Sequence, residues 1–446
     1  MASIRPAAVA GLFYPGECRG LAGELDELLG RAADPVPRAA FPKALVVPHA
    51  GYVYSGAVAA RAYGELSTAR GIVRRVVLLG PVHRVPVRGL AAPSTDAFAT
   101  PLGTVPVDQA ALRALHDLPQ VLRSDAAHAM EHSLEVQLPF LQAVLGEFSL
   151  VPLAVGTASV AEVAEVLERL WGGTETLIVI STDLSHYHRY EEARRIDAAT
   201  LARIASLATD IDHDEACGAT PLNGLLACAK KRGRALRLLA ACNSGDTAGG
   251  KDRVVGYSSL ALDEVAPAEA GAALVTIARS AIEGRLLQRT AASSAADWLA
   301  RPGATFVTIL KDGALRGCIG SLEATRPLAR DVVENALAAA FRDPRFPALS
   351  AEEWPQCALE VSLLSAPQRL RFTGEADLLR QIRAGEDGLI LEADGRRGTF
   401  LPQVWESLPD KRAFVAELLR KAQLPADTPL DRCSISRYRV VKFNGR

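Results

Sequence analysis

The first two-thirds of the chain alternate between short apolar runs and longer amphipathic stretches. Compact, β-branched runs that end at a proline, a glycine or a polar turn predict strands over 43–48, 74–81, 148–156, 176–182 and, last, 252–262. Between them, residues 160–172 and 190–207 carry apolar positions at spacings of three and four, which predicts helices. Because these strands are apolar throughout, both faces of the sheet should be covered. We therefore expect an α/β domain with a central mixed or parallel sheet and helices on both faces.

The pattern changes near residue 265. A segment of small residues, acids and a proline predicts a linker over 265–272, between domains 1–264 and 273–446. Beyond it we predict helices over 272–287 and 328–342 and a strand over 357–367. Residues 304–322 predict a β-hairpin that turns at Asp312-Gly313. This half should be an α+β domain.

Composition narrows the class of protein. With 446 residues, 49% hydrophobic and 23% charged, the chain is globular and long enough for two or three domains. A net charge of −1 indicates neither nucleic acid nor an anionic membrane as a partner, and no apolar run reaches the length of a membrane span. Pro6 and Pro15 bracket the first apolar patch, so we interpret it as an ordered segment and not a signal peptide. Seven cysteines without a C-x-x-C pair argue against a disulfide framework, and we expect a cytoplasmic protein.

Polar side chains follow three of the predicted strands. His49 comes after the first, His83 after the second, and Asp183 and His186 after the run at 176–182. Ligands collect beyond the carboxyl ends of strands in open α/β sheets, so these side chains should converge on one crevice. For any single histidine, capping a loop or satisfying a backbone carbonyl is the commoner role, but we do not adopt that interpretation for the set of three.

Two further stretches offer candidate ligands. In "MEHSLEVQLPFL", His132 and Glu135 lie three apart, which would place them on one helical face as ligands or supporting groups, or on a charged solvent face. Cys217 should open a helix, whose N-terminus favours the thiolate that binds metal. A buried, inert cysteine is the alternative.

Six ordered blocks over residues 1–262 resemble the Memo family: "RPAAVAGLFYP", "PHAGYVYSGAVAARAYG", "LGPVHRVP", "EHSLEVQLPFL", "STDLSHY" and "CGATPLNGLL". The resemblance implies the LigB-like fold of class III extradiol dioxygenases. It implies a metal pocket of His49, His83 and Cys217, lined by Asp183 and His186, with His132 as the histidine of the E-H-S block.

The chemistry of that fold family sets the expected roles. Extradiol cleavage needs Fe(II) with open positions, usually held by two histidines and a carboxylate. His186 would act as acid and base, oriented by Asp183, while Tyr52, Tyr54 and His132 contact the substrate. Here Cys217 would replace the carboxylate, and a thiolate also suits Cu or Zn.

The second half resembles the AMMECR family through "LRGCIGSLE", "AFRDPRFPAL" and "GRRGTFLPQVWE". Cys318 beside Arg316 is a candidate nucleophile, although no histidine follows residue 213, and a Cys packed in a strand is the simpler interpretation. Arg342, Asp343 and Arg345 could hold a phosphate or carboxylate, or form an internal ion pair. Arg396 and Arg397 could add to a basic cleft. A fusion of the two families also resembles the AmmeMemoRadiSam system, which implies a radical SAM protein as partner.

Three functions remain open at this stage. The first is a metal-dependent oxidoreductase that acts on a small molecule or a macromolecule-borne group, with Fe(II) as the first expectation. The second is a non-catalytic adaptor that binds a metal or a peptide in the same pocket. The third, ranked last, is a thiol hydrolase that uses Cys217 with His49 or His186.

Overall fold

The computed structural model describes residues 2–32, 38–288, 296–425 and 428–445, which form two compact units. The first unit comprises residues 2–32 and 41–264, and the second comprises 38–40 and 265–445. Most of the segment predicted as a linker, 265–272, lies in helix α9 (Pro267–Leu286) of the second unit. Pro267 stands in the first turn of α9, where its missing N–H costs nothing, and the alanines that follow favour a helix.

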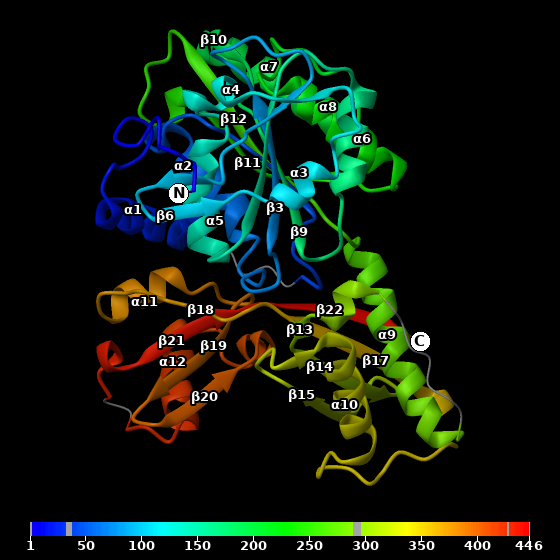
Figure 1. Ribbon diagram of the computed structural model, residues 1–446. Helices are drawn as coiled ribbons and strands as arrows, with labels where there is room; N and C mark the ends of the chain where they lie inside the picture. The colour runs from blue at the N-terminus through cyan, green and yellow to red at the C-terminus, as the bar shows by residue number, and fades with distance from the viewer. Residues whose placement is uncertain (1, 33–37, 289–295, 426–427, 446) are drawn as a thin grey trace. The chain divides into compact units, whose positions relative to one another are not determined.

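A mixed sheet forms the centre of the first unit (Figure 1). Its middle is parallel, in the order β2 (Ala44–Val47), β9 (Thr176–Ser181), β3 (Arg75–Pro81), β8 (Ser149–Val155). The antiparallel strand β12 (Val254–Leu262) continues it beyond β2, and both β10 (His186–His188) and β11 (Leu236–Asn243) pair with β12. On the other side β4 (Leu90–Ala92) pairs with β8, and β7 (Val121–Arg123) with β4. The five strands predicted from apolar runs are confirmed.

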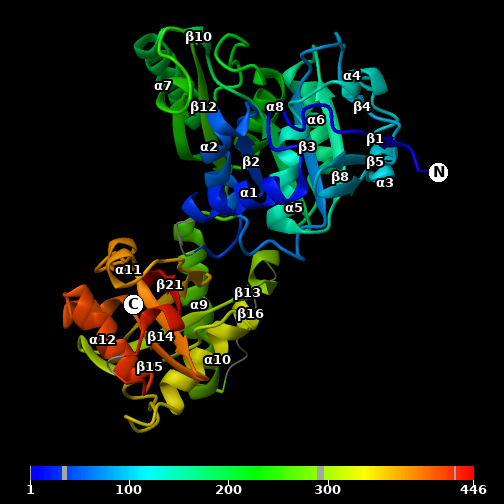
Figure 2. The same cartoon turned by 90° about the vertical axis from the view of Figure 1, so that its left-hand side faces the viewer.

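Helices cover both faces of this sheet (Figures 1 and 2). On one side α1 (Cys18–Ala32), α2 (Tyr52–Gly64) and α5 (Leu138–Leu145) pack together, and on the other α6 (Val160–Leu170) packs on α8 (Ala219–Lys231). Helix α7 (Tyr190–Ala205) packs on β11 and β12. Strands β2, β3, β8 and β9 are buried almost throughout, which is why their sequences do not alternate. The predicted α/β class is confirmed.

A smaller sheet anchors the N-terminal segment of the first unit. Its order is β1 (Ile4–Arg5), β5 (Ala97–Thr100), β6 (Gly103–Pro106). The short helices α3 (Gln109–Arg113), α4 (Asp125–Ala129) and η1 (Glu135–Gln137) lie in the connections. The buried Arg5 pairs with the buried Glu135 at 2.7 Å, which ties the start of the chain to η1.

The second unit is α+β, as predicted. Its first sheet has the order β15 (Ala314–Gly320), β14 (Thr305–Lys311), β17 (Cys357–Leu364), β22 (Val440–Gly445), covered by α9 and α10 (Leu328–Phe341). A two-stranded pair, β13 (Pro302–Gly303) with β16 (Arg326–Pro327), lies beside α10. The second sheet has the order β18 (Gln368–Arg369), β21 (Ser434–Tyr438), β19 (Gly388–Ala393), β20 (Arg396–Phe400), with α11 (Glu375–Gln381) and α12 (Lys411–Lys421). The predicted hairpin is β14–β15, and its turn residues Asp312 and Gly313 both have positive φ, 51° and 81°.

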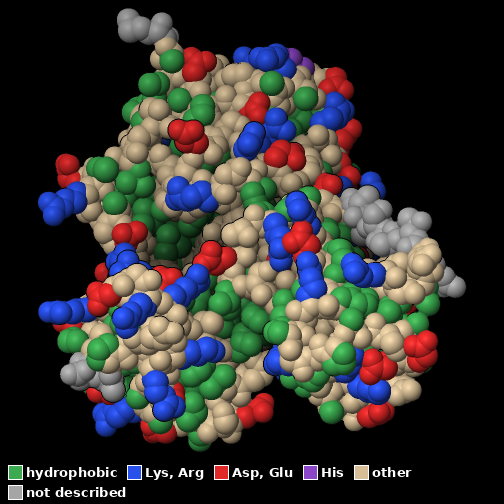
Figure 3. Space-filling model, turned by 90° about the horizontal axis from the view of Figure 1, so that it is seen from below, with side chains coloured by type: hydrophobic (Ala, Val, Ile, Leu, Met, Phe, Trp, Pro, Cys, Tyr) green, Lys and Arg blue, Asp and Glu red, His purple; other side chains and the backbone are tan. Residues whose placement is uncertain are grey.

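Charged side chains of both signs lie on the face drawn in Figure 3. On the face shown in Figure 3, Lys and Arg side chains alternate with Asp and Glu side chains and with apolar patches. This distribution agrees with the near-zero net charge. Among the described residues, no helix has both the length and the apolar character needed to cross a membrane.

Candidate metal centre

The carboxyl ends of three neighbouring parallel strands meet at one place in the first unit. His49 follows β2 after Pro48, His83 lies two residues beyond β3, and Asp183 lies two residues beyond β9. The His49 and His83 rings lie 5.3 Å apart between centroids. The convergence expected from the sequence is therefore present, because the order β2-β9-β3 places these strand ends side by side.

A third imidazole joins the first two from a loop. His132 lies between α4 and η1, with its ring 5.4 Å from that of His49 and 4.6 Å from that of His83. The next residue, Ser133, fixes this loop on the sheet, since its hydroxyl donates to the carbonyl of Pro81 at 2.8 Å. Gly80 makes that approach possible, because a Cβ there would stand 2.9 Å from the Ser133 Oγ.

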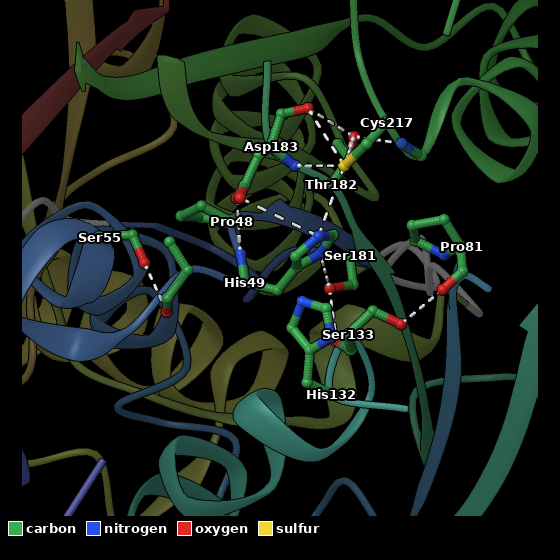
Figure 4. A network of polar contacts seen from close by, with 12 residues as sticks. Pro48, His49, Ser55, Pro81, His132, Ser133, Ser181, Thr182, Asp183 and Cys217 are labelled. Carbon is green, nitrogen blue, oxygen red and sulfur yellow. Dashed lines mark hydrogen bonds and ion pairs between the residues drawn. The ribbon is translucent and has the colours of Figure 1, made fainter. Parts of the chain in front are cut away.

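Hydrogen bonds around Ser181 define the tautomer of His49 (Figure 4). The Ser181 hydroxyl donates its only hydrogen to the carbonyl of Ser133 at 2.7 Å. It also accepts from Gln137 Nε2 at 2.9 Å, an amide that donates to the Pro48 carbonyl as well. The 2.9 Å contact between His49 Nδ1 and Ser181 Oγ must then be an N–H donation from the ring. Nε2 of His49 is left with a lone pair.

Glu131 accepts from Nδ1 of the other two rings, as Ser181 does from Nδ1 of His49. Its carboxylate lies 2.9 Å from Nδ1 of His83 and 3.2 Å from Nδ1 of His132, and it accepts the backbone N–H groups of both residues. Burial works to raise the pKa of Glu131, but hydrogen bonds from His132 and His83 outweigh it and hold that pKa well below its ordinary value. An ionised carboxylate only accepts, so both rings carry hydrogen on Nδ1, and the neutral form of each ring has its lone pair on Nε2.

The three imidazoles fit a metal ion. Among the described residues, His49, His83 and His132 form a group whose potential ligand atoms all lie within 4.8 Å of one another. Metal–nitrogen distances of about 2.1 Å place donors of one ion ~3–4 Å apart, so small ring movements suffice. Nδ1 bonded to an oxygen and Nε2 free is the arrangement that supports metal-ligating histidines. Burial, with His132 and His83 as neighbours, lowers the pKa of His49 well below its ordinary value, which keeps this ring neutral.

Cys217 lies at the edge of this group and outside it. Its Sγ is 3.4 Å from Nε2 of His49 and accepts the backbone N–H of Asp183 at 3.3 Å. The residue precedes α8, whose N-cap is Gly218. Without a metal ion, burial and the charge of Asp183 raise the pKa of Cys217 to about 12, which favours the buried, inert cysteine of the two interpretations. The helix N-terminus does not outweigh desolvation here.

Asp183 and His186 have separate partners. The Asp183 carboxylate accepts the backbone N–H of His49 at 2.8 Å, and burial raises its pKa. The Nδ1 of His186 donates to the carbonyl of Leu184 at 2.8 Å. The backbone therefore orients His186, whereas Asp183 positions the chain at His49. This differs from the expected Asp183–His186 pair because residue 186 already belongs to strand β10.

The predicted substrate contacts lie elsewhere, with the exception of His132. Tyr52 is buried, and its hydroxyl donates to the carbonyl of Val136, away from the histidines. Tyr54 is partly exposed and does not line the cavity described below. Glu135 is neither a ligand nor on a solvent face, since it is fully buried against Arg5 and Tyr14. The predicted helix over His132 and Glu135 begins only at Glu135.

A cavity of about 710 Å³ opens over the three histidines. It is lined by His49, His83, Arg84, His132, Asp183, His186, Tyr187, His188, His213, Asp214 and Cys217. Sequence reasoning missed Glu131, Ser181 and Arg84. Only the position of Glu131 and Arg84 beside candidate histidines could have signalled them. The volume is typical of a small-molecule site.

The candidates in the second unit form internal ion pairs. Arg345 pairs with Asp343 at 2.7 Å and holds the pKa of Asp343 well below its ordinary value. Arg316 is largely buried and pairs with Glu353 at 2.9 Å. Of the two interpretations of this arginine-rich segment, the structure shows the internal pair.

The other candidate residues of the second unit also contact neighbouring groups of that unit. Cys318 is half-buried, receives a hydrogen bond from the Thr308 hydroxyl at 3.3 Å, and donates its backbone N–H to Asp343. Arg342 is exposed, with a long contact of 3.5 Å to the Glu334 carbonyl. Arg397 pairs with Glu323 and Glu392, and Arg396 donates to the Gln423 carbonyl.

Fold and site together define an α/β protein with three imidazoles gathered beyond the carboxyl ends of its parallel strands, joined to an α+β unit. The chain belongs to the Memo-like protein family, whose model matches residues 5–261, and the AMMECR1 model matches residues 275–443.

The chain is similar to several known proteins. A MEMO1 family protein of Aquifex aeolicus is 38% identical over 267 residues, 57% of this chain and 97% of its own length. One from Ignicoccus hospitalis is 36% identical over 288 residues, 58% of this chain and 98% of its own. A solved structure, the uncharacterized protein PH0010 from Pyrococcus horikoshii, is 33% identical and covers 40% of this chain and 91% of its own, with a TM-score of 0.36.

Proposed function

We propose that His49, His83 and His132 bind one metal ion and that the protein is a metal-dependent oxidoreductase related to the extradiol dioxygenases. One observation carries the proposal: three rings whose Nδ1 atoms are bonded to protein oxygens and whose potential ligand atoms lie within 4.8 Å of one another. Three protein ligands are typical of catalytic metal sites, which keep a position open. A bound redox-active ion would supply electron transfer at that open position.

Fe(II) is the proposed ion, with Cu or Zn as alternatives. Imidazole suits all three metals, so the histidines do not select between them. The sulfur of Cys217, 3.4 Å from the His49 Nε2, is the proposed additional donor and favours a softer ion. Metal binding would make the thiolate accessible despite its high pKa in the protein alone.

His186 is the proposed acid–base group. Its Nδ1–H is held by the Leu184 carbonyl, so the Nε2 lone pair is the one free to accept a proton from a substrate in the cavity. The substrate is a small molecule or a group carried on a macromolecule. The pairing of Memo and AMMECR units supports a radical SAM protein of the same system as partner.

A non-catalytic adaptor is the second candidate, because none of the three grouped donors is a carboxylate. The two functions differ in turnover. Protein reconstituted anaerobically with Fe(II) should consume oxygen when a catechol or a cell extract is added, and His186→Gln should reduce the rate by about 10²–10⁴-fold while iron content stays the same. The adaptor would be favoured if iron-loaded protein, given a catechol or a cell extract, consumed oxygen no faster than the same mixture without protein.

A further inference from the structure

The second unit presents an open sheet edge that has no task in the function described so far. Strand β22 is the last strand in the order β15-β14-β17-β22, so one of its sides has no neighbouring strand. Ser365 donates its backbone N–H to the carbonyl of Arg439 at 2.9 Å, which turns the backbone groups of Arg439 toward β17. Because these groups alternate in direction along a strand, Val440, Lys442 and Asn444 direct theirs away from β17. In the described parts of the chain, no other segment pairs with them.

The neighbouring ladder of hydrogen bonds stops where this edge begins. Strand β21 runs on into β22, with β18 and β17 along one side of this continuous strand and β19 along the other. Strand β19 pairs with β21 only from Gly388 onward. Before that point the chain turns away, because the backbone N–H groups of Glu386 and Asp387 both donate to the carbonyl of Arg383, at 3.3 and 3.0 Å. The Asp387 carbonyl accepts from Nε1 of Trp405 at 2.7 Å, so it does not extend the ladder along β22.

A cavity of about 790 Å³ lies in the gap between β22 and the turn before β19. It is lined by residues 439–442, by residues 384–386 and by η5 (Pro402–Glu406), which ends the stretch "GRRGTFLPQVWE" of the sequence. Trp405 makes this wall rigid, because its ring stacks on that of Phe414 with the two centroids 3.6 Å apart. The volume suits a ligand the size of a short peptide.

The side chains of β22 indicate which peptide would fit. Val441 and Phe443 are half-buried and pack against the core that α9 covers. The Phe443 ring lies over Gly271 of α9, where a Cβ would stand 2.2 Å from the ring. On the opposite face Lys442 is exposed and pairs with Glu360 at 3.2 Å. An added strand would therefore place apolar side chains beside Val441 and Phe443, and polar ones beside Lys442.

From the open edge and the cavity beside it, we infer that β22 binds an extended peptide of a partner protein as an added strand, with apolar side chains at alternate positions. The backbone groups of the peptide would pair with those of Val440, Lys442 and Asn444, and sites of this kind take affinity from such bonds and specificity from alternate side chains. A strand that pairs with these residues is about five residues long. This role belongs to the second unit and does not depend on the metal centre.

Fluorescence anisotropy with the full-length protein and a labelled probe peptide tests the inference. The probe is a capped hexapeptide of alternating valine and threonine, and the comparison peptide has the same residues in two blocks. The wild type should bind the alternating peptide and hold the blocked one about tenfold less tightly. Lys442→Pro removes the outward N–H, which an edge strand tolerates, and should weaken binding by about tenfold, the effect of one lost hydrogen bond. Lys442→Gln, the matched control, keeps that N–H and should bind as the wild type does.

Hydrogen exchange locates the bound probe independently of any variant. A saturating concentration of the alternating peptide should slow exchange over residues 439–445 and leave residues 396–400, the β20 edge, unchanged. The inference is overturned if the wild type binds neither peptide, if both peptides bind equally, or if folded Lys442→Pro binds as tightly as the wild type. A wild-type dimer in sedimentation that Lys442→Pro dissociates would overturn it as well, because a second copy of the chain would then occupy the edge.

Discussion

At the scale of single residues, the site depends on which nitrogen of each imidazole carries hydrogen. Ser181 and Glu131 accept from Nδ1 of all three rings, so Nε2 is the nitrogen through which each neutral ring can bind an ion. Neither residue lines the cavity over the three histidines. Both act on the metal through the orientation and basicity of its ligands.

Removing the charge of Glu131 should weaken metal binding while all three histidines remain. A glutamine lacks the negative charge that both Nδ1–H groups face at Oε1. If its oxygen takes the Oε1 position, its amide nitrogen, a donor, takes the place of Oε2, which accepts the backbone N–H of His83 at 2.6 Å. We expect Glu131→Gln to lower zinc affinity by about 10–100-fold in competition with a chelator. Glu147→Gln, an exposed control in the same unit, should have no effect. Equal affinity for Glu131→Gln and the wild type would refute this role.

Cobalt substitution can decide whether Cys217 is a ligand. The 3.4 Å separation between its Sγ and Nε2 of His49 predicts that the sulfur joins the bound ion. Cobalt-loaded wild type should then show a sulfur-to-cobalt charge-transfer band, and Cys217→Ser should lose it, whereas Cys242→Ser should keep it because Cys242 does not line the cavity. An unchanged spectrum in Cys217→Ser would limit the ligands to the three histidines.

The sequence identified the site residues that follow strands and missed those that depend on a loop. His49, His83 and Asp183 could be found because a run of apolar residues marks each strand end. His132 was expected to contact substrate, since nothing in the strand pattern shows that Ser133 ties its loop to Pro81. The pKa of Cys217 could not be predicted either, because burial by distant segments outweighs the local effect of the helix.

At the scale of elements, the N-terminal segment is held by one buried carboxylate. Glu135 accepts from Arg5, from the Tyr14 hydroxyl and from the backbone N–H groups of residues 8 and 9. Glu135→Ala leaves the buried Arg5 unpaired, so we expect a loss of about 3–5 kcal/mol in the free energy of unfolding of the first unit. Hydrogen exchange of first-unit peptides across a urea series measures this change in the free energy of unfolding. The exposed control Glu192→Ala should change the free energy of unfolding by less than about 0.5 kcal/mol. A similarly small effect for Glu135→Ala would contradict the prediction.

The same substitution should have opposite effects at two glycines. Gly313, in the β14–β15 turn, has φ of 81°, so Gly313→Ala should destabilise the second unit by about 1 kcal/mol or more. Gly23 is exposed within α1 and has free space around its Cα, so Gly23→Ala should stabilise the first unit by about 0.5–1 kcal/mol. Urea unfolding, monitored by hydrogen exchange in each unit, gives the sign of the change in the free energy of unfolding for both substitutions. Equal signs would contradict the backbone argument.

Elements could be predicted wherever local pattern and burial agree. The strands at β2, β3, β8 and β9 are buried on both faces, and the hairpin turn has residues suited to positive φ. The stretch 132–135 was assigned to a helix by its spacing, yet its residues are held instead by Glu131 and by the strand ends. Short segments of this kind are determined by tertiary contacts.

At the scale of the whole molecule, all eight histidines lie between residues 49 and 213, within the first unit. Zinc should therefore stabilise that unit alone. At a free zinc concentration a hundred times the dissociation constant, the free energy of unfolding of the first unit should rise by about 2.7 kcal/mol. Hydrogen exchange should slow in peptides of residues 41–264 and stay unchanged in those of 296–425. Equal slowing in both units would show that metal acts elsewhere as well.

The most direct test of the metal centre is the metal content of anaerobically reconstituted protein by elemental analysis. The account predicts about one iron per chain in the wild type and in the His116→Ala control, an exposed histidine outside the cavity, and little or none in His49→Ala and His83→Ala. Equal metal in the wild type and in His49→Ala, or none in any of these proteins with any of the three metals, would contradict it.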